Sequence, residues 1–518
     1  LKNEKLKYRL VLRTDYADGF RKNIFLNKSD TSKKDELTLR YKLNWNFNKT
    51  TDINFVISKI DMDDPADIWT IDGSLNTLSD RPGMDSQETN SYGVKVTKNF
   101  NNFDLQSFTS ATKTDVIFSY DADWGNPESH FPYTYDYFSE TLRKRDTFSQ
   151  EIRFLSKNTD FSEKKPFEWV FGFDFSELEE TNVTRDDGIY GDPSDPYGPY
   201  ASESIIARNY EAENLSLFGN IDYFLSENYK LAFGLRWENW NSKYKDSNQE
   251  SFKPSDNMNG GKISLIKNND NSNIYLSFAR GYKQGGFNLG LDATDNTIKD
   301  SLIYNPEFLT NYEIGINSKS NDMNFNYSAV IFFSKREDQQ VLISKQVDPT
   351  DPNTFSYLTQ NAAEGENYGL EISSNYFVSD NLYLFANLGF LKTKIKNWQS
   401  RIDLQDRAQA HAPEKTYSVG MNFDLMNNFY LKFDINGKSS FYYSDSHDNK
   451  SQSYQLVNIH FGYSKDNISA ELWIRNAFDK YYSTRGFYFG NEAPNFVDTL
   501  YRRQGDPKNF GLSLRYNF

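Results

Sequence analysis

The chain has 518 residues, no cysteine and a formal net charge of −14 at pH 7. Its mean hydropathy is −0.76 and it has no run of about 18 apolar residues, which excludes a protein that crosses a membrane with helices. The negative charge argues against nucleic acid as a partner, because phosphate binding requires a basic surface. An aromatic content of 16% is far too high for a disordered chain.

Apolar and polar side chains alternate in many short segments, from residues 7–15 at the start of the chain to residues 506–518 at its end. In the last segment Phe510, Leu512 and Leu514 fall on one face. Such alternation predicts strands with one apolar and one wet face. We count twenty predicted strands, and clean examples lie at 37–46, 231–238, 368–373, 415–424 and 468–474.

The links between the predicted strands alternate between short and long, which gives ten outer loops and nine inner turns. The short links lie near 47–51, 100, 157–165, 224–228, 268–271, 320–322, 378–380, 425–427 and 465–467. The outer links are expected at 16–35, 63–88, 116–146, 179–208, 247–259, 284–307, 344–365, 395–414, 445–451 and 477–507.

This organisation predicts an all-β fold, a transmembrane antiparallel β-barrel with long extracellular loops and short periplasmic turns. Strands of about ten residues cross the apolar band of about 25 Å, and closure satisfies every backbone group in lipid. Alternation averages to a hydrophilic mean, and the aromatic residues become interfacial girdles. A sandwich or propeller gives no reason for one end to carry all the long links. A soluble carbohydrate-binding β-protein stays open as an alternative.

Several motifs resemble the TonB-dependent outer-membrane receptors of the siderophore and iron-complex type. The final segment is similar to that family's C-terminal strand, whose terminal aromatic residue, here Phe518, is read by the assembly machinery. NAFDKYY at 476–482 resembles the motif before the last outer loop, with Ala477 in place of the usual Leu. Further similar segments are SQEIRFLS at 149–156, WVFGFDF at 169–175, ARGYKQGGFN at 279–288, NYEIGI at 311–316, NYGLEI at 367–372 and APEKTYSVG at 412–420.

The chain departs from the family pattern at its N-terminus. Family members begin with a globular plug carrying a TonB box, and nothing here resembles one. DGFRKN at 18–23 resembles the segment after the family's third barrel strand. Twenty strands against the family's barrel of about 22 agree with a missing plug and two missing strands. We therefore expect residues 1–518 to be the barrel domain of a truncated or split receptor.

The resemblance implies an outer-membrane receptor of a Gram-negative bacterium that imports a scarce nutrient, a ferric siderophore or similar iron complex. Its implied partners are TonB with the inner-membrane energising complex, acting through the missing plug, the outer-membrane lipids and the nutrient ligand, with no nucleic acid and no cofactor. The alternatives are a passive diffusion porin and a TonB-dependent receptor for cobalamin or an oligosaccharide. The sequence also has no catalytic constellation, since it lacks GxSxG and HExxH motifs and cysteine, so we expect no enzyme.

Two groups of residues are candidates for function. Inward charges are expected to form networks that hold a plug, with ligand contact as the alternative: Arg236, Glu238, Glu371, Glu471, Arg475 and Arg515. Aromatic residues of the outer loops are expected to stack on a planar or sugar-like ligand: Trp69, Trp124, Tyr133, Tyr135, Tyr137, Tyr190, Tyr197 and Tyr200.

The histidines and acidic clusters bear on the ligand. The four histidines are far apart in sequence, which argues against haem or zinc, and no metal site is predicted. Asp63 to Asp67 and Asp121 to Trp124 lack the spacing of an EF-hand and are expected to be solvated acidic loops. Loop 63–88 has seven acidic residues against one basic, loop 179–208 has seven against two, and loop 477–507 has four of each. This balance slightly favours a neutral or cationic ligand over a tri-anionic ferric catecholate.

Overall fold

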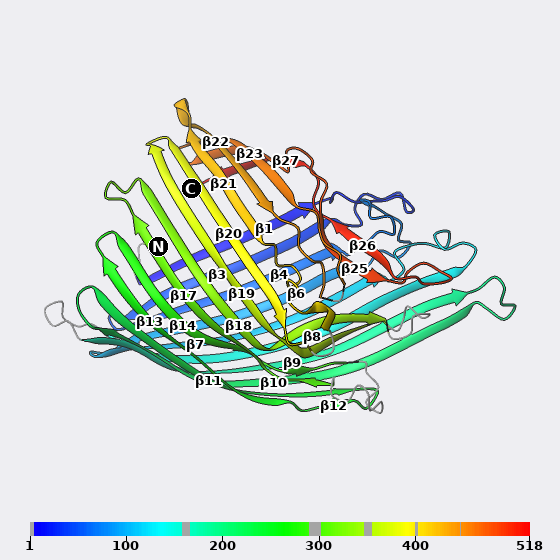
Figure 1. Cartoon of the computed structure of the whole chain (residues 1–518), viewed down its shortest axis with the longest axis horizontal. Coiled ribbons are helices and arrows are strands. Elements are labelled where there is room, and N and C mark those ends of the chain that lie inside the picture. Colours follow the sequence, from blue (N-terminus) through cyan, green and yellow to red (C-terminus); the bar gives the residue numbers. More distant parts are fainter. Residues whose placement is uncertain are drawn as a thin grey trace.

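The computed structural model describes residues 5–157, 166–289, 302–346, 355–398, 402–445 and 447–517, so Phe518 lies outside the described residues. Twenty strands form a continuous antiparallel ladder in which each strand pairs with the next one along the chain, from β1 and β3 to β24 and β27. The sheet curves so that the blue and cyan strands form one wall and the green, yellow and orange strands form the facing wall (Figure 1). This antiparallel architecture confirms the predicted all-β fold class.

The order of the strands in the ladder is their order along the chain. They are β1 (Leu6–Ala17), β3 (Lys34–Asn48), β4 (Thr51–Pro65), β6 (Met84–Asn99), β7 (Phe103–Asp121), β8 (Thr134–Ser156), β9 (Phe167–Gly191), β10 (Tyr200–Phe224), β11 (Tyr229–Asp246), β13 (Ser255–Asn269), β14 (Ser272–Lys283), β17 (Glu307–Lys319), β18 (Phe325–Gln346), β19 (Phe355–Ser379), β20 (Leu382–Lys396), β21 (Lys415–Asp424), β22 (Phe429–Lys438), β23 (Tyr454–Lys465), β24 (Ile468–Arg475) and β27 (Asn509–Tyr516).

The links between these strands confirm the predicted ten outer loops and nine inner turns. The outer links carry small elements of their own: β2 (Lys22–Asn23) pairs with β5 (Asn76–Thr77), β12 (Ser251–Phe252) pairs with β11, β15 (Gly286–Phe287) pairs with β16 (Ile303–Tyr304), β25 (Ser483–Phe489) pairs with β26 (Thr499–Gln504), and η3 covers Ile402–Leu404. The inner turn before β22 holds the 3-10 turn η4 (Met426–Asn428).

Two predicted outer loops are largely strand in the structure. The loop expected at 116–146 shrinks to residues 122–133, and the loop expected at 179–208 shrinks to residues 192–199. Strands β9 and β10 have 25 residues each. A strand needs only about ten residues to cross the apolar band. Beyond the lipid both faces of a hairpin meet water, so alternation fades and the sequence pattern no longer indicates a strand.

The outer surface of the ladder is apolar, as the alternation predicts. Leu276, Ile331, Leu472 and Leu514 are between 56% and 73% exposed, although each is a large hydrophobic residue on a strand. A water-soluble protein rarely displays such a continuous apolar surface. Exposed aromatic rings also gather beside the inner turns, as in an interfacial girdle: Phe47, Phe100, Phe167, Tyr223, Phe325, Phe377 and Phe429.

The buried hydrophobic residues lie mainly at the outer end, where loops pack on one another. One cluster joins Val341, Ile395, Trp398 and Leu404 from β18, β20 and the link after β20. Trp124 and Tyr135 are buried in another. Within the described residues, no helix is long and apolar enough to span a bilayer.

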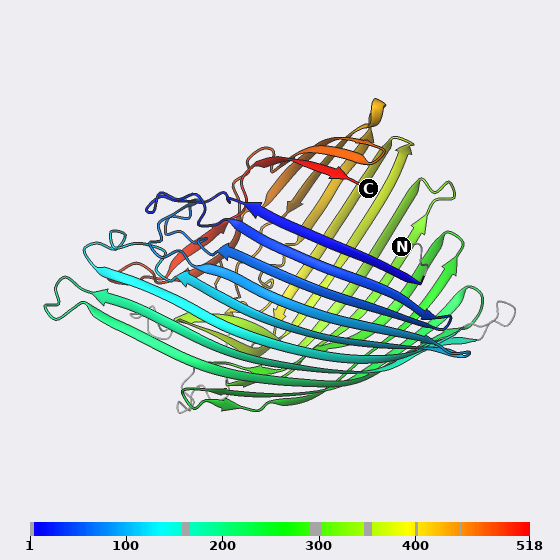
Figure 2. The same cartoon turned by 180° about the vertical axis from the view of Figure 1, so that it is seen from behind.

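The ends of the ladder are β1, which pairs with β3, and β27, which pairs with β24. Figure 2 shows β1, in dark blue, and β27, in red, on the same side of the molecule. Because each strand is antiparallel to the next, an even number of strands makes β1 and β27 run in opposite directions.

Candidate functional site in the outer loops and the lumen

An aromatic core ties three outer segments together. We call the links 66–83 and 122–133 and the hairpin β25–β26 the outer cap. The rings of Trp69 and Trp124 stack with centroids 5.7 Å apart. Phe487 of β25 meets Trp69 edge-on at 4.7 Å, and Tyr501 of β26 meets Trp124 edge-on at 4.8 Å. Each contact adds favourable burial, so the hairpin is fixed against the two links.

A buried polar cluster fixes the tip of the hairpin. Asp123 is 1% exposed, and its carboxylate accepts main-chain hydrogen bonds from Gly125 at 2.9 Å and Tyr137 at 2.8 Å. Its main-chain carbonyl accepts a 2.6 Å hydrogen bond from the amide of Asn491. His130 Nε2 lies 3.7 Å from Asp123 Oδ1. The buried carboxylate of Asp123 therefore stabilises the conformation of the link 122–133 through these hydrogen bonds.

Asp67 has the same role in the link 66–83. It is 2% exposed, and its carboxylate accepts hydrogen bonds from Asn23 at 3.0 Å, from Ser79 at 3.0 Å and from the hydroxyl of Thr77. The expectation that these acidic clusters are solvated is therefore wrong for Asp67 and Asp123, because loop packing buries carboxylates that satisfy local hydrogen-bond donors.

Burial and neighbouring carboxylates around the cap also raise the pKa of acidic groups, including Asp80 and Asp121. Burial, with the nearby carboxylates of Asp136 and Asp123, raises the pKa of Asp80 above its ordinary range. No group of three or more His, Asp or Glu side chains in the described ranges is arranged to hold a metal ion.

The opposite face of the hairpin contacts the link 439–453. The ring of His447 lies 4.9 Å from the ring of Tyr488, and the amide of Asn449 donates a 2.7 Å hydrogen bond to the Tyr488 hydroxyl. A Cβ on Gly486 would lie 2.8 Å from the ring of Tyr443, so glycine permits this close approach. The hairpin is thus held between loops that follow β4 and β7 on one face and β22 on the other.

The link 439–453 is in turn tied to the link 397–414. The guanidinium of Arg407 donates hydrogen bonds to the main-chain carbonyls of Ser444 at 2.7 Å and His447 at 2.6 Å. Burial lowers the pKa of His447, helped by the positive charge of Arg407. Burial also lowers the pKa of His411 and raises the pKa of Asp445. The links 397–414 and 439–453 thus contact each other beside the outer cap.

The predicted aromatic candidates differ in how far the structure buries their side chains. Trp124 and Tyr135 are 7% and 3% exposed, so they contribute to packing within the cap. Tyr197 and Tyr200, at the tip of the β9–β10 hairpin, are 85% and 54% exposed. The other four are partly exposed, and ligand stacking by the set stays a prediction: Trp69, Tyr133, Tyr137 and Tyr190.

Two of the lumen networks involve the predicted charges. Arg236 and Glu238 form an ion pair at 3.0 Å, and the hydroxyl of Tyr282 donates to Glu238 at 3.0 Å. Glu471 accepts hydrogen bonds from Lys432 at 3.1 Å and from the Tyr430 hydroxyl at 2.8 Å.

The remaining three lumen candidates are less connected. The guanidinium of Arg475 lies 4.9 Å from the centroid of the Trp473 ring, where a cation–π contact forms. Glu371 and Arg515 are exposed and make no ion pair within the described part of the chain. Whether these six charges contact a plug or a ligand stays a prediction.

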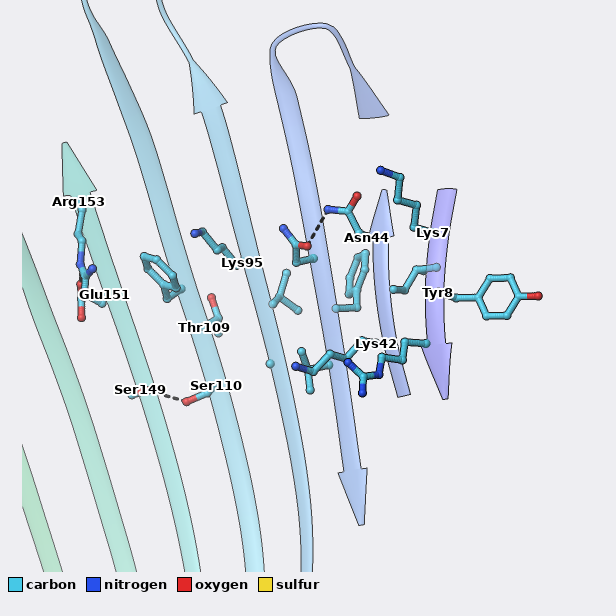
Figure 3. Close-up of a pocket in the computed structure, with 18 of the residues that line it drawn as sticks. Lys7, Tyr8, Lys42, Asn44, Lys95, Thr109, Ser110, Ser149, Glu151 and Arg153 are labelled. Atoms are coloured by element: carbon cyan, nitrogen blue, oxygen red, sulfur yellow. Dashed lines mark hydrogen bonds and ion pairs between the residues drawn. The ribbon is translucent and has the colours of Figure 1, made fainter. Parts of the chain in front are cut away.

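A recess in the lumen wall is lined by more basic than acidic side chains. It has a volume of about 670 Å³ and is lined by β1, β3, β4, β6, β7, β8 and β9. Figure 3 shows Lys42, Lys95 and Thr109 on this wall, with Tyr8 pointing away from it. Five cations line the recess against two anions: Lys7, Arg9, Lys42, Lys95 and Arg153 against Glu151 and Asp174.

The hairpin β25–β26 lies within residues 477–507, for which the sequence predicts a single loop. The signal is present but weak: Phe487 and Phe489 alternate within β25, and Gly490, Asn491 and Pro494 lie in the turn. Two short strands outside the main ladder have too few positions for alternation to stand out.

The curved antiparallel ladder, with its apolar outside, polar lumen and packed outer loops, defines a β-barrel protein of the membrane-receptor type. Residues 10–477 match the family model described as TonB dependent receptor-like, beta-barrel. The chain belongs to this family, which is one of receptors and transporters, and its members are outer-membrane proteins of Gram-negative bacteria.

Individual relatives are distant. The chain is 20% identical over 406 residues to the pesticin receptor of Yersinia enterocolitica, which covers 74% of this chain and 54% of that protein. It therefore spans about half the length of the curated relatives it matches. Among solved structures, the ferric yersiniabactin uptake receptor FyuA of Yersinia pestis has a TM-score of 0.79 at 16% identity, covering 100% of this chain and 76% of that one. The siderophore receptor PiuA of Acinetobacter baumannii has a TM-score of 0.75 at 15% identity, covering 99% and 78%. These likenesses show the shared fold.

Proposed function

We propose that the chain is the barrel of an outer-membrane active-transport receptor, which binds a ferric siderophore or similar iron complex and imports it to the periplasm with energy from TonB. The family match and the names of several relatives support this ligand class. The observation that carries the proposal is the outer cap, whose hairpin β25–β26 contacts loops on both of its faces. Packed loops suit the capture of a ligand, whereas a diffusion porin requires free passage.

TonB-driven import through this barrel requires a plug domain, and the described residues contain none. We assign residues 1–518 to the barrel domain and expect the plug and two further strands in a preceding segment or a separate chain. The basic recess supports this, since Lys7, Lys42 and Lys95 make no ion pair within the described residues and offer a docking surface for an acidic plug face. Two added strands also preserve the antiparallel order between β27 and β1.

The protein is proposed to act without a cofactor and to break no bond in its ligand. Its partners are then the nutrient ligand, the outer-membrane lipids and TonB with its inner-membrane complex, reached through the plug. The family match and the exposed apolar surface of the ladder support an outer-membrane location.

The experiment is uptake of radioactive iron by a Gram-negative strain that lacks its own iron receptors. The strain expresses the chain together with its proposed plug, supplied either as a preceding segment or as a separate chain. We expect iron uptake from chelates that requires TonB and stops when a protonophore collapses the proton gradient. Uptake that persists without TonB, together with large ungated conductance steps in planar bilayers, would instead establish a porin. A parallel assay with cobalamin and oligosaccharides tests the non-iron ligands.

A further inference from the structure

Several acidic residues near the mouth form ion pairs, so fewer free carboxylates face a ligand there. Arg81 forms ion pairs with both Asp136 and Asp187, the latter at 2.7 Å. Glu180 contacts Arg143 at 3.1 Å and also pairs with Arg145. Asp67 and Asp123 are buried, so their carboxylates do not meet a ligand directly. The count of acidic residues in the sequence therefore does not show which charges an anion contacts at the mouth.

The arginines of the hairpin β25–β26 are not engaged in this way. Arg485 and Arg503 lie directly opposite each other in the ladder, and both are exposed. Opposite residues of an antiparallel pair project on the same face about 5 Å apart, where like charges repel. Within the described residues, neither guanidinium makes a hydrogen bond or an ion pair.

Within the described residues, none of the four acidic residues of the same outer link forms an ion pair with either arginine: Asp479, Glu492, Asp498 and Asp506. Glu492 accepts a hydrogen bond from the Tyr501 hydroxyl at 3.1 Å, and Asp479 accepts one from the main chain of Lys508 at 2.8 Å. The balanced composition of this link therefore includes two adjacent guanidinium groups that no carboxylate of the link pairs with.

A third arginine lies behind this pair. Arg21, on the link between β1 and β3, is 4% exposed and donates a 3.3 Å hydrogen bond to the main-chain carbonyl of Gln504, next to Arg503. Burial lowers the pKa of Arg21, and the positive charge of Arg503 acts in the same direction, while Asp67 and Asp506 act against it. The structure therefore concentrates guanidinium groups from two links beside the aromatic core of the outer cap.

We propose that Arg485 and Arg503 form a binding subsite for an anionic iron chelate, one that presents carboxylate or catecholate oxygens to the outer mouth. This inference rests on the proposed function and defines its ligand class. Guanidinium groups bind such oxygens with paired, charge-assisted hydrogen bonds, and an anion between the two arginines relieves their mutual repulsion. An anionic ligand differs from the neutral or cationic ligand that the composition of the outer loops favours.

The test uses the full-length receptor with its plug, purified in detergent, and measures binding by quenching of tryptophan fluorescence. The probes are the trianionic ferric tris-catecholate, anionic ferric citrate and cationic ferrioxamine B, the iron complex of desferrioxamine B. We expect the anionic probes to bind more tightly than the cationic one. The double variant Arg485→Gln, Arg503→Gln should lose about tenfold or more in affinity for the bound anionic probe. The salt dependence of that affinity should also fall.

Two further variants separate charge from folding. Arg502→Gln removes an exposed arginine from the other face of the same hairpin, opposite Gly486, and should change affinity by less than about twofold. The double variant Arg485→Lys, Arg503→Lys keeps the charge and should retain part of the affinity. A receptor that binds no anionic probe, or a Gln double variant that binds as tightly as the wild type, would overturn the subsite. TonB-dependent uptake of the cationic complex alone would overturn the subsite and leave the proposed function standing.

Discussion

Asn491 donates a 2.6 Å hydrogen bond to the main-chain carbonyl of Asp123, which lies 368 residues earlier in the chain, and the two residues are 0% and 1% exposed. This contact joins the turn of hairpin β25–β26 to the link between β7 and β8. It explains how the last outer link is held against the first half of the barrel. Because the carbonyl is buried, loss of its donor leaves it without compensation from water.

The first prediction concerns this contact. Asn491→Ala should destabilise the attachment of the hairpin turn by about 1–3 kcal/mol, since a buried carbonyl loses its partner. Hydrogen exchange of residues 490–498, measured by mass spectrometry, should become faster. Asn495→Ala is the matched control, because Asn495 is exposed in the same turn, and it should leave exchange unchanged. Equal protection in Asn491→Ala and the wild type would show that the hydrogen bond does not hold the turn.

The second prediction concerns the aromatic core of the cap. Trp124→Ala removes a 7% exposed ring that contacts Trp69, Phe487 and Tyr501, and should cost about 3–5 kcal/mol of local stability. Trypsin added to intact cells should then cleave the hairpin at its exposed arginines. The barrel itself should keep its heat-modifiable migration on gels, because the strands of the ladder do not depend on this ring.

The control for this change is Tyr197→Ala. Tyr197 is 85% exposed, so its loss should not open the cap. If Tyr197→Ala weakens ligand binding without added proteolysis, the stacking role predicted for Tyr197 is supported. Cleavage at the same rate in Trp124→Ala and the wild type would contradict the packing role of Trp124.

The third prediction is a pH dependence of the link 439–453. Burial lowers the pKa of His447 below its ordinary value of 6.5, and His447 Nδ1 accepts a 3.3 Å hydrogen bond from the main chain of Asn449. A depressed pKa means that the stabilisation is present above pH 6.5 and is lost as the pH falls through the pKa of the folded state. Protonation removes the acceptor and adds a charge beside Arg407.

Hydrogen exchange of residues 439–453, corrected for its intrinsic pH dependence, measures this effect. Protection should be constant from pH 8 to about 7 and should fall on acidification below about 6. His447→Gln should flatten the dependence, although His411, whose pKa is also lowered by burial, leaves part of it. Protection that rises on acidification would reverse the predicted sign.

The fourth prediction concerns the lumen. Glu471→Gln removes the charge that pairs with Lys432 at 3.1 Å, and should cost about 0.5–1 kcal/mol because both side chains are partly exposed to solvent. A double-mutant cycle with Lys432→Met, followed by thermal unfolding in detergent, isolates the pair. Ser469→Ala on the same strand is the control and should have no effect. Strict additivity of the two changes would show that the pair does not stabilise the barrel.

Much of the barrel can be predicted from the sequence, because a strand between lipid and a wet lumen requires alternation at every second residue. Leu472 and Glu471 occupy adjacent positions, and their outward and inward placement follows from this rule alone. This rule does not predict the extensions of β9 and β10. Both faces of a hairpin that lies in water are solvated, so its side chains need not alternate between apolar and polar. The motifs at 279–288 and 476–482 identify the family from local chemistry, without three-dimensional information.

The candidate site depends on contacts that local patterns do not contain. The sequence by itself determined the strand order, the side of each loop and the apolar outer face, since each follows from neighbours along the chain. Only the tertiary structure decided that Asp67 and Asp123 are buried and hydrogen-bonded, that Trp69 meets Trp124, and that Arg485 faces Arg503 with no ion-pair partner among the described residues. The physical reason is that a count of charged residues gives each residue the same weight. Burial and ion pairing, which depend on the tertiary structure, decide which charges a ligand contacts.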